Sequence, residues 1–300
     1  MRLRAQSINV TAFSKLVDSI SKLSKRAVFR FTPTELKIIS TGDFDDGVRF
    51  FGSVVELFGT NYRIESNANN EISLELSTYA LSSALRQSSA TPIEFIIRLG
   101  KLGRTPFLSL NLTAVGPTGV DYSVEQCVAV KVLKPIDAAA LREPSCPDPE
   151  IKITLPKLSD VCKVAERLKS LSDTITVSAS KAGGFRLGVS TDHADVETEW
   201  RGLSIVSGPS EETQEEESVS RSKHSTNEFF QAKVRSRGLL KFLHAHPIGR
   251  ASIACICEGH SLIMLIYIKD VSRSNMEDSN DGLVGTLFAY LPVVNEDGDQ

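Results

Sequence analysis

The feature that most constrains the fold of this chain is an internal repeat about one domain long. Residues 3–41 read as strand, amphipathic helix, strand, turn and strand, and residues 151–191 follow the same plan. A second pair of matching segments covers residues 71–99 and 229–258. A period of roughly 150 residues is too long for a solenoid and close to the size of an ordinary domain. The sequence therefore predicts two similar domains in tandem.

The limits of these domains follow from changes in composition. We expect domain one over residues 1–133, an interdomain connector over 134–150 and domain two over 151–300. The connector carries four prolines and few large apolar residues, which favours an exposed, extended segment. Two acidic, serine-rich segments, 207–228 and 269–285, are predicted to be mobile loops because they cannot form a packed core.

Composition limits the class of protein without defining a function. The 300 residues are 41% hydrophobic, which is enough to bury two ordinary cores. No apolar run approaches the ~18 residues of a membrane span, and the first residues lack the apolar run of a secretory signal. The five cysteines are odd in number and fit an intracellular, reducing compartment. The net charge of −3 gives no overall indication of nucleic-acid binding.

Motifs that would indicate catalysis or metal binding are missing. Residues 100–105 lack the pattern of a phosphate loop and are predicted to form a hairpin turn. Cys255 and Cys257 have no second cysteine pair, so core packing is expected. His244 and His246 stand at a predicted helix end, where an imidazolium suits the helix dipole. We predict no catalytic residue, no metal and no cofactor. An α+β enzyme with a site built from scattered residues, or a protein-only adaptor, remains an alternative.

Charge on four predicted helices, 11–25, 78–87, 157–171 and 236–246, is more informative. Opposite the apolar stripe of each helix most charges are positive, although the chain as a whole is slightly acidic. The basic residues on these faces are Lys15, Lys22, Lys25, Arg86, Lys163, Arg167, Arg237 and Lys241. They are either ordinary solvated faces or, if one surface gathers all four helices, a track for phosphates. Such a track would bind a nucleic acid through its backbone, without sequence specificity.

The order of these segments resembles the DNA sliding clamps. Within that family, residues 68–90 and 147–192 are most similar to the Hus subunit of the checkpoint clamp, a heterotrimeric relative of the replicative clamp PCNA. Residues 1–6 and 287–292 also fit. The resemblance implies an α+β sliding-clamp fold of two tandem similar domains, each with two helices on one side of antiparallel sheet.

The resemblance also implies a function and a set of partners. The chain would be a non-catalytic, nuclear subunit of a ring-shaped clamp that is loaded at damaged DNA. It would act in the DNA damage checkpoint and serve as a platform for repair enzymes. The implied partners are two different clamp subunits, a clamp-loader ATPase, double-stranded DNA, and checkpoint and repair proteins, with no membrane. A homotrimeric replicative clamp of the PCNA type is the alternative.

Site residues follow from the same resemblance. The eight basic residues named above would line the hole of the ring. Strand pairing between subunits would use the free edges at 122–133 and 195–202, with the residues Tyr122, Val124, Val128, Val130, Val196, Thr198 and Trp200. A partner groove under the connector would be lined by Ile39, Ile136, Tyr290, Leu291 and Pro292. The small residues 138–140 of the connector disfavour a strong groove.

Overall fold

The structure is a computed structural model of the 300-residue chain. It describes residues 1–6, 10–40, 47–55, 58, 61–86, 93–116, 119–206, 228–269 and 283–294. The two predicted loops lie outside these residues apart from their ends at 228, 269 and 283–285. Residues 269 and 283–285 belong to strands and not to a loop.

The first half of the chain holds two helices and nine strands among its described residues. The helices are α1 (Val10–Leu23) and α2 (Thr78–Arg86). The strands are β1 (Arg2–Gln6), β2 (Arg26–Phe31), β3 (Leu36–Ser40), β4 (Arg49–Val54), β5 (Arg63–Glu65), β6 (Ile72–Ser77), β7 (Glu94–Leu102), β8 (Thr105–Val115) and β9 (Asp121–Val132).

The second half follows a short connector helix, α3 (Pro135–Ala140). Its helices are α4 (Leu158–Lys169), α5 (Ser236–Leu243) and the one-turn 3₁₀ helix η1 (His246–Ile248). Its described strands are β10 (Ile151–Thr154), β11 (Thr174–Ser180), β12 (Phe185–Ser190), β13 (Asp195–Trp200), β14 (Phe229–Arg235), β15 (Gly249–Cys257), β16 (Ser261–Lys269) and β17 (Leu283–Pro292).

The two halves repeat one topology, as the internal repeat predicts. In the first half the strands are ordered β1–β7–β8–β9 and β6–β2–β3–β4, and in the second β10–β15–β16–β17 and β14–β11–β12–β13. All paired neighbours in these sheets are antiparallel. The α+β clamp fold is therefore confirmed, while the domain limits at residues 133 and 151 stay a prediction.

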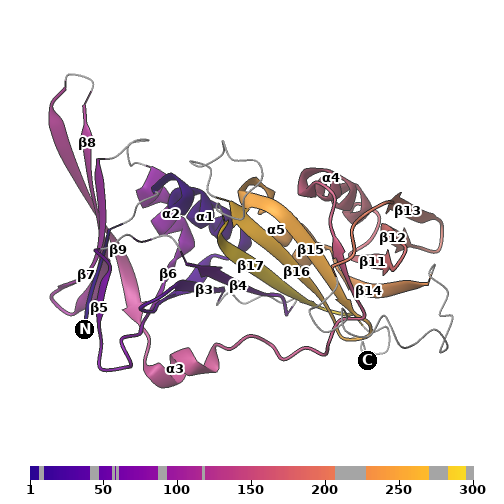
Figure 1. Cartoon of the computed structure of the whole chain (residues 1–300), viewed down its shortest axis with the longest axis horizontal. Helices are drawn as coiled ribbons and strands as arrows, with labels where there is room; N and C mark the ends of the chain where they lie inside the picture. Colours follow the sequence, from indigo (N-terminus) through magenta and orange to yellow (C-terminus); the bar gives the residue numbers. More distant parts are fainter. Residues whose placement is uncertain are drawn as a thin grey trace, which may run out of the picture.

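One strand pair joins the halves. β17 runs antiparallel to β4 from Gly285 opposite Val54 to Tyr290 opposite Arg49. This junction merges the strands of both halves into a sheet of 13 strands, while β11 to β14 form a separate sheet of four. Figure 1 shows α1, α2, α4 and α5 together on one side of the sheets and α3 on the opposite side.

Helix α1 illustrates why the helices cover the sheets. Its apolar residues recur with helical spacing, and Phe13, Leu16, Val17 and Ile20 are all buried in the core. An apolar stripe along one side of a helix directs that face to the sheet and leaves the opposite face to solvent. The basic residues between the apolar positions are consequently exposed.

The connector differs from the extended segment that we predicted. Pro135 is the first residue of α3, Asp137 lies in its first turn, and residues 138–140 are all alanine. Proline is preorganised for the start of a helix, an acidic side chain suits its positive end, and alanine has the highest helix propensity. These local preferences exceed the effect of the proline content. Within the connector, Lys134 and residues 141–150 lack helix and strand.

The predicted hairpin turn is confirmed. Leu102 of β7 pairs with Thr105 of β8, so Gly103 and Arg104 alone form the turn. Gly103 has a φ of +61°, the left-handed conformation that glycine adopts without steric cost. In the described part of the chain no helix has the length and apolar character needed to cross a membrane.

Candidate nucleic-acid interface

Four helices from both halves form one surface, which carries the basic residues selected from the sequence. α1 packs beside α2, α4 beside α5, and α1 also contacts α5 across the boundary between the halves. Lys15 and Lys22 lie on α1, Arg86 ends α2, Lys163 and Arg167 lie on α4, and Arg237 and Lys241 on α5. Lys25 follows the end of α1 by two residues. Lys241 is partly buried and the other seven are exposed.

Asp18 on α1 orients two of these basic side chains. It accepts hydrogen bonds from Arg86 and, at 3.1 Å, from Ser82 Oγ of α2, and Lys22 Nζ lies 3.6 Å from its carboxylate. Burial works to raise the pKa of Asp18, but the hydrogen bonds from Arg86 and Ser82 and the nearby positive charges outweigh it. The pKa of Asp18 is therefore lowered. Asp18 joins α1 to α2 and positions Arg86 and Lys22 on the helix surface.

The remaining cations differ in how far they are neutralised. Lys163 Nζ lies 3.6 Å from Asp160 one turn away on α4. Lys15, Lys25, Arg167 and Arg237 form no ion pair with any residue that the structure describes. Unpaired exposed cations are the groups that bind phosphates through release of counterions.

A cavity of about 450 Å³ lies where α1 meets α4 and α5. Its cations are Lys22, Lys169, Arg237 and Lys241, and Glu166, Leu240 and His244 complete the lining. The cavity therefore gathers positive charge from both halves of the chain. Our prediction missed Lys169 because it lies beyond the outward third of α4, although its place in the last turn was a usable signal.

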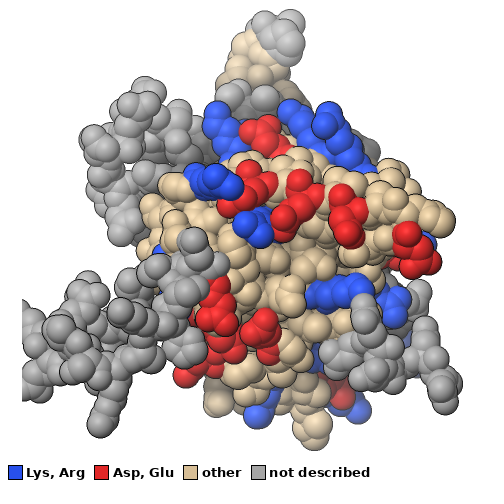
Figure 2. Space-filling model, turned by 90° about the vertical axis from the view of Figure 1, so that its right-hand side faces the viewer, with Lys and Arg blue, Asp and Glu red and all other residues tan. Residues whose placement is uncertain are grey.

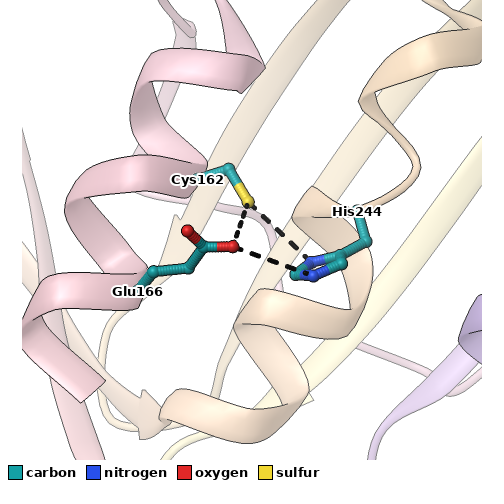
Figure 3. A group of neighbouring side chains, drawn as sticks. All are labelled: Cys162, Glu166 and His244. Atoms are coloured by element: carbon teal, nitrogen blue, oxygen red, sulfur yellow. Dashed lines mark hydrogen bonds and ion pairs between the residues drawn. The ribbon is translucent and has the colours of Figure 1, made fainter. Parts of the chain in front are cut away.

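Beside this cavity, Cys162, Glu166 and His244 bring metal-ligating atoms together, although the sequence predicted no metal (Figure 3). Their ligand atoms all lie within 4.8 Å of one another. Burial raises the pKa of the Cys162 thiol to about 11, and Glu166 adds to this effect. His244 caps the end of α5, as its position in the sequence predicted.

The two predicted edges are only partly free. β13 ends the four-stranded sheet and pairs with β12 on one side alone. β9 pairs with β8 over residues 121–129, and its last three residues pair with β6. Val130 therefore does not lie on a free edge, because it pairs with Leu76.

Side chains at these edges divide between the core and solvent. Tyr122 is exposed, Val124 is partly buried, and Val128 and Val130 belong to the core. On β13, Val196 is exposed, whereas Thr198 and Trp200 are partly buried and the Trp200 ring packs on Phe185. Any added strand would accordingly be held mainly by backbone hydrogen bonds.

The opposite face of β13 is acidic. Asp195, Glu197 and Glu199 alternate along the strand, and Arg186 lies 3.5 Å from both glutamates. Figure 2 shows this end of the molecule, which a row of acidic side chains crosses. Two groups of basic side chains lie at the top of the same view, toward the helices.

The connector covers part of the predicted partner groove. A cavity of about 280 Å³ is lined by Ile39, Phe51, Phe288 and the connector residue Leu141. Leu141 packs on the small apolar cluster of Val28, Ile39 and Phe51. Leu141 thus covers part of this apolar surface.

Of the five predicted groove residues, two lie at this place. Ile39 lines the cavity, and Tyr290 packs edge-on against Phe51 while its hydroxyl donates to Glu143 at 3.3 Å. Ile136 is 82% exposed, Leu291 is buried in the main core, and Pro292 is exposed; none of these three lines the cavity. Adjacent residues of a strand face opposite sides, so Tyr290 and Leu291 cannot line one groove.

The fold defines the class of protein first. The crystal structure of Proliferating Cellular Nuclear Antigen from Entamoeba histolytica superposes with a TM-score of 0.69, covering 98% of this chain and 99% of that one. The identity is 13%, so the likeness concerns the fold: this chain has the fold of a PCNA-type sliding clamp.

The sequence then identifies the family. Residues 1–285 match the family model of the Hus1-like protein. Checkpoint protein hus1 of Schizosaccharomyces pombe is 31% identical over 273 residues, covering 90% of this chain and 94% of that protein. Checkpoint protein HUS1 of Homo sapiens is 26% identical, covering 85% and 90% respectively. The chain belongs to the Hus1-like family.

Proposed function

We propose that this chain is a non-catalytic, nuclear subunit of a ring-shaped DNA clamp that is loaded at damaged DNA and acts in the DNA damage checkpoint. The observation that carries the proposal is the surface where α1, α2, α4 and α5 expose basic side chains from both halves of the chain. Membership of the Hus1-like family, whose curated relatives are checkpoint proteins, supports the same interpretation.

The internal junction suggests how the ring closes. β17, the last strand of the second half, pairs with β4 of the first. By the repeated strand order, β9 occupies in the first half the place of β17, and β13 occupies in the second half the place of β4. These two strands have unpaired edges, so β9 of one subunit would pair with the β13 equivalent of the next, as β17 pairs with β4.

Charge at these edges favours a ring of different subunits over a homotrimer. The unpaired stretch of β9 carries Asp121 and Glu125, β13 carries Asp195, Glu197 and Glu199, and neither stretch contains a basic residue. Like charges on directly opposed strands are destabilising. Pairing β9 of one copy with β13 of another would bring acidic side chains together. The homotrimeric replicative clamp is therefore disfavoured for this chain.

The basic surface would hold double-stranded DNA through its phosphates, without reading sequence. A clamp-loader ATPase would open and close the ring, and checkpoint and repair proteins would dock on its outside. Because Leu141 occupies part of the connector groove, we expect such partners to bind at other surfaces as well.

The test is retention of the assembled ring on closed circular DNA. Reversing Lys22 and Arg167 (Lys22→Glu with Arg167→Glu) should lower retention at least tenfold. The logarithm of DNA affinity falls linearly with the logarithm of salt concentration, and the double variant should reduce the steepness of this line by about 2. The reason is that each phosphate that is no longer neutralised lowers the slope by about one. The matched control is Lys37→Glu with Arg142→Glu, on the connector side of the sheet. It should leave retention unchanged. Equal retention of both double variants would contradict the proposed DNA surface.

A further inference from the structure

A cluster of three side chains between α4 and α5, at the edge of the basic cavity, forms a second candidate site. Cys162 and Glu166 lie one turn apart on α4, and His244 ends α5. Figure 3 shows all three side chains converging in the space between the two helices. A thiol, a carboxylate and an imidazole are three of the ligand types that proteins use for zinc.

The distances in the cluster approach those of a coordination sphere. Cys162 Sγ lies 3.8 Å from Glu166 Oε1, and the His244 ring approaches the sulfur through Nδ1, also at 3.8 Å. His244 Nε2 lies 3.9 Å from Glu166 Oε1. Ligands of tetrahedral zinc are about 3.3–3.6 Å apart, given the usual bond lengths. The ligand atoms of the three residues lie within 4.8 Å of one another, so a rearrangement of these side chains would bring them onto one ion.

The orientation of the His244 ring favours a cation at the centre. His244 Nδ1 lies 2.6 Å from the Leu240 carbonyl oxygen. A carbonyl can only accept, so Nδ1 carries the proton, and in the neutral ring Nε2 presents a lone pair. That lone pair faces the Glu166 carboxylate beside the Cys162 sulfur, so three electron-pair donors converge. Metal-binding histidines usually donate their other N–H to a carbonyl in the same way.

The charges around the cluster favour Zn²⁺ over harder metal ions. Lys22, Lys169, Arg237 and Lys241 line the adjoining cavity, and their charges oppose a hard cation such as Mg²⁺ or Ca²⁺, which is held by electrostatic attraction to oxygen. Zn²⁺ bonds strongly to thiolate, and the thiolate and carboxylate together balance its charge. We infer that Cys162, Glu166 and His244 bind one Zn²⁺ ion, with the fourth position open to the cavity.

Titration of the full chain with Co²⁺, a spectroscopic substitute for Zn²⁺, tests this inference. One equivalent should bind, produce a thiolate-to-cobalt absorption band in the near ultraviolet and be displaced by Zn²⁺. Cys162→Ser should abolish the band, whereas Cys127→Ser, which alters an exposed cysteine elsewhere, should leave it intact. A band that persists in Cys162→Ser, or no bound Co²⁺ at all, would overturn the inference.

Because Cys162 is buried, Cys162→Ser could lose the band through misfolding. Variants of the two exposed residues of the cluster therefore provide a second test. Glu166→Gln and His244→Ala alter side chains that are 54% and 46% exposed, so both variants should fold. Each should weaken Co²⁺ binding at least tenfold. His246→Ala, two residues beyond the cluster, should bind Co²⁺ like the unaltered chain. Unchanged affinity in both ligand variants would equally rule out the site, whatever the DNA experiment shows.

Discussion

Gly238 of α5 lies against Val48, the residue before β4, so that a Cβ atom on Gly238 would stand 2.5 Å from Val48 Cγ2. This close approach joins a helix of the second half to the sheet of the first. Both residues are buried, and there is no flexible side-chain end that could move aside. The glycine is thus required by packing between the two halves and not by its backbone conformation.

Gly238→Ala should therefore destabilise the chain, although alanine in a helix is ordinarily better than glycine by about 1 kcal/mol. Overpacking a well-packed core costs about 1–3 kcal/mol, and we expect a net loss in that range. Denaturant unfolding measures it. Adding Val48→Ala should remove the clash, and the double variant should be more stable than the sum of the single effects predicts. Strict additivity of the two changes would show that the contact is not responsible.

Gly285 occupies a comparable position at the β17–β4 junction. A Cβ atom there would lie 2.1 Å from the Ser53 carbonyl oxygen, which belongs to the backbone and cannot rotate away. Gly285→Ala should separate the strands at this end and cost about 2–4 kcal/mol. Amide hydrogen exchange should increase in β4 more than in β7, which lies far from the junction. Uniform exchange across both strands would point to general unfolding.

The lowered pKa of Asp18 predicts that the stability of the fold decreases at acidic pH. Its pKa in the folded chain is below the ordinary value of 3.8, so the ionised carboxylate stabilises the fold above that pH and the effect is lost as pH falls through the folded pKa. Asp18→Asn should lower the stability by less than about 1 kcal/mol at pH 7, as expected of a partly exposed ion pair. The difference between the two proteins should vanish in strong acid. A difference that persists there would indicate a packing effect.

The acidic edges predict that the isolated chain does not assemble with itself through β9 and β13. Making β9 basic, with Asp121→Lys and Glu125→Lys, should allow it to pair with the acidic β13 of another copy. Sedimentation should then detect self-association that falls as salt rises. Adding Glu197→Lys should reverse it. A control with equal charge change at exposed positions elsewhere, Glu71→Lys with Asp148→Lys, should remain unassociated.

Local sequence patterns predicted most of the architecture because each depends on near neighbours. The apolar stripe that contains Phe13 and Val17 predicted α1, and the charges between its members predicted which residues are exposed. The repeat predicted the shared strand order. The connector was predicted less well, because its prolines suggested an extended segment while the Ala138–Ala140 run formed a helix.

Two features could not be inferred from local sequence patterns: the packing of the connector in the groove, and the grouping of Cys162, Glu166 and His244. Leu141 packs in the groove because the connector returns across β3 and β4, and no local pattern encodes that return. Cys162 and His244 are separated by 82 positions. Each alone looks like an ordinary helix residue, and only the packing of α4 on α5 brings their ligand atoms together.

The sequence by itself determined the two repeated halves and the family, because these are read from the order of residues along the chain. It also determined the four main helices and most strands, because their periodicity acts over a few residues at a time. Only the tertiary structure decided that the basic faces share one surface and that Gly238 packs too closely on Val48 for a side chain. It also decided that β9 has one unpaired edge over 121–129 but none at Val130. These depend on how elements far apart in the chain approach one another. That approach is set by the joint packing of both halves across the β17–β4 junction.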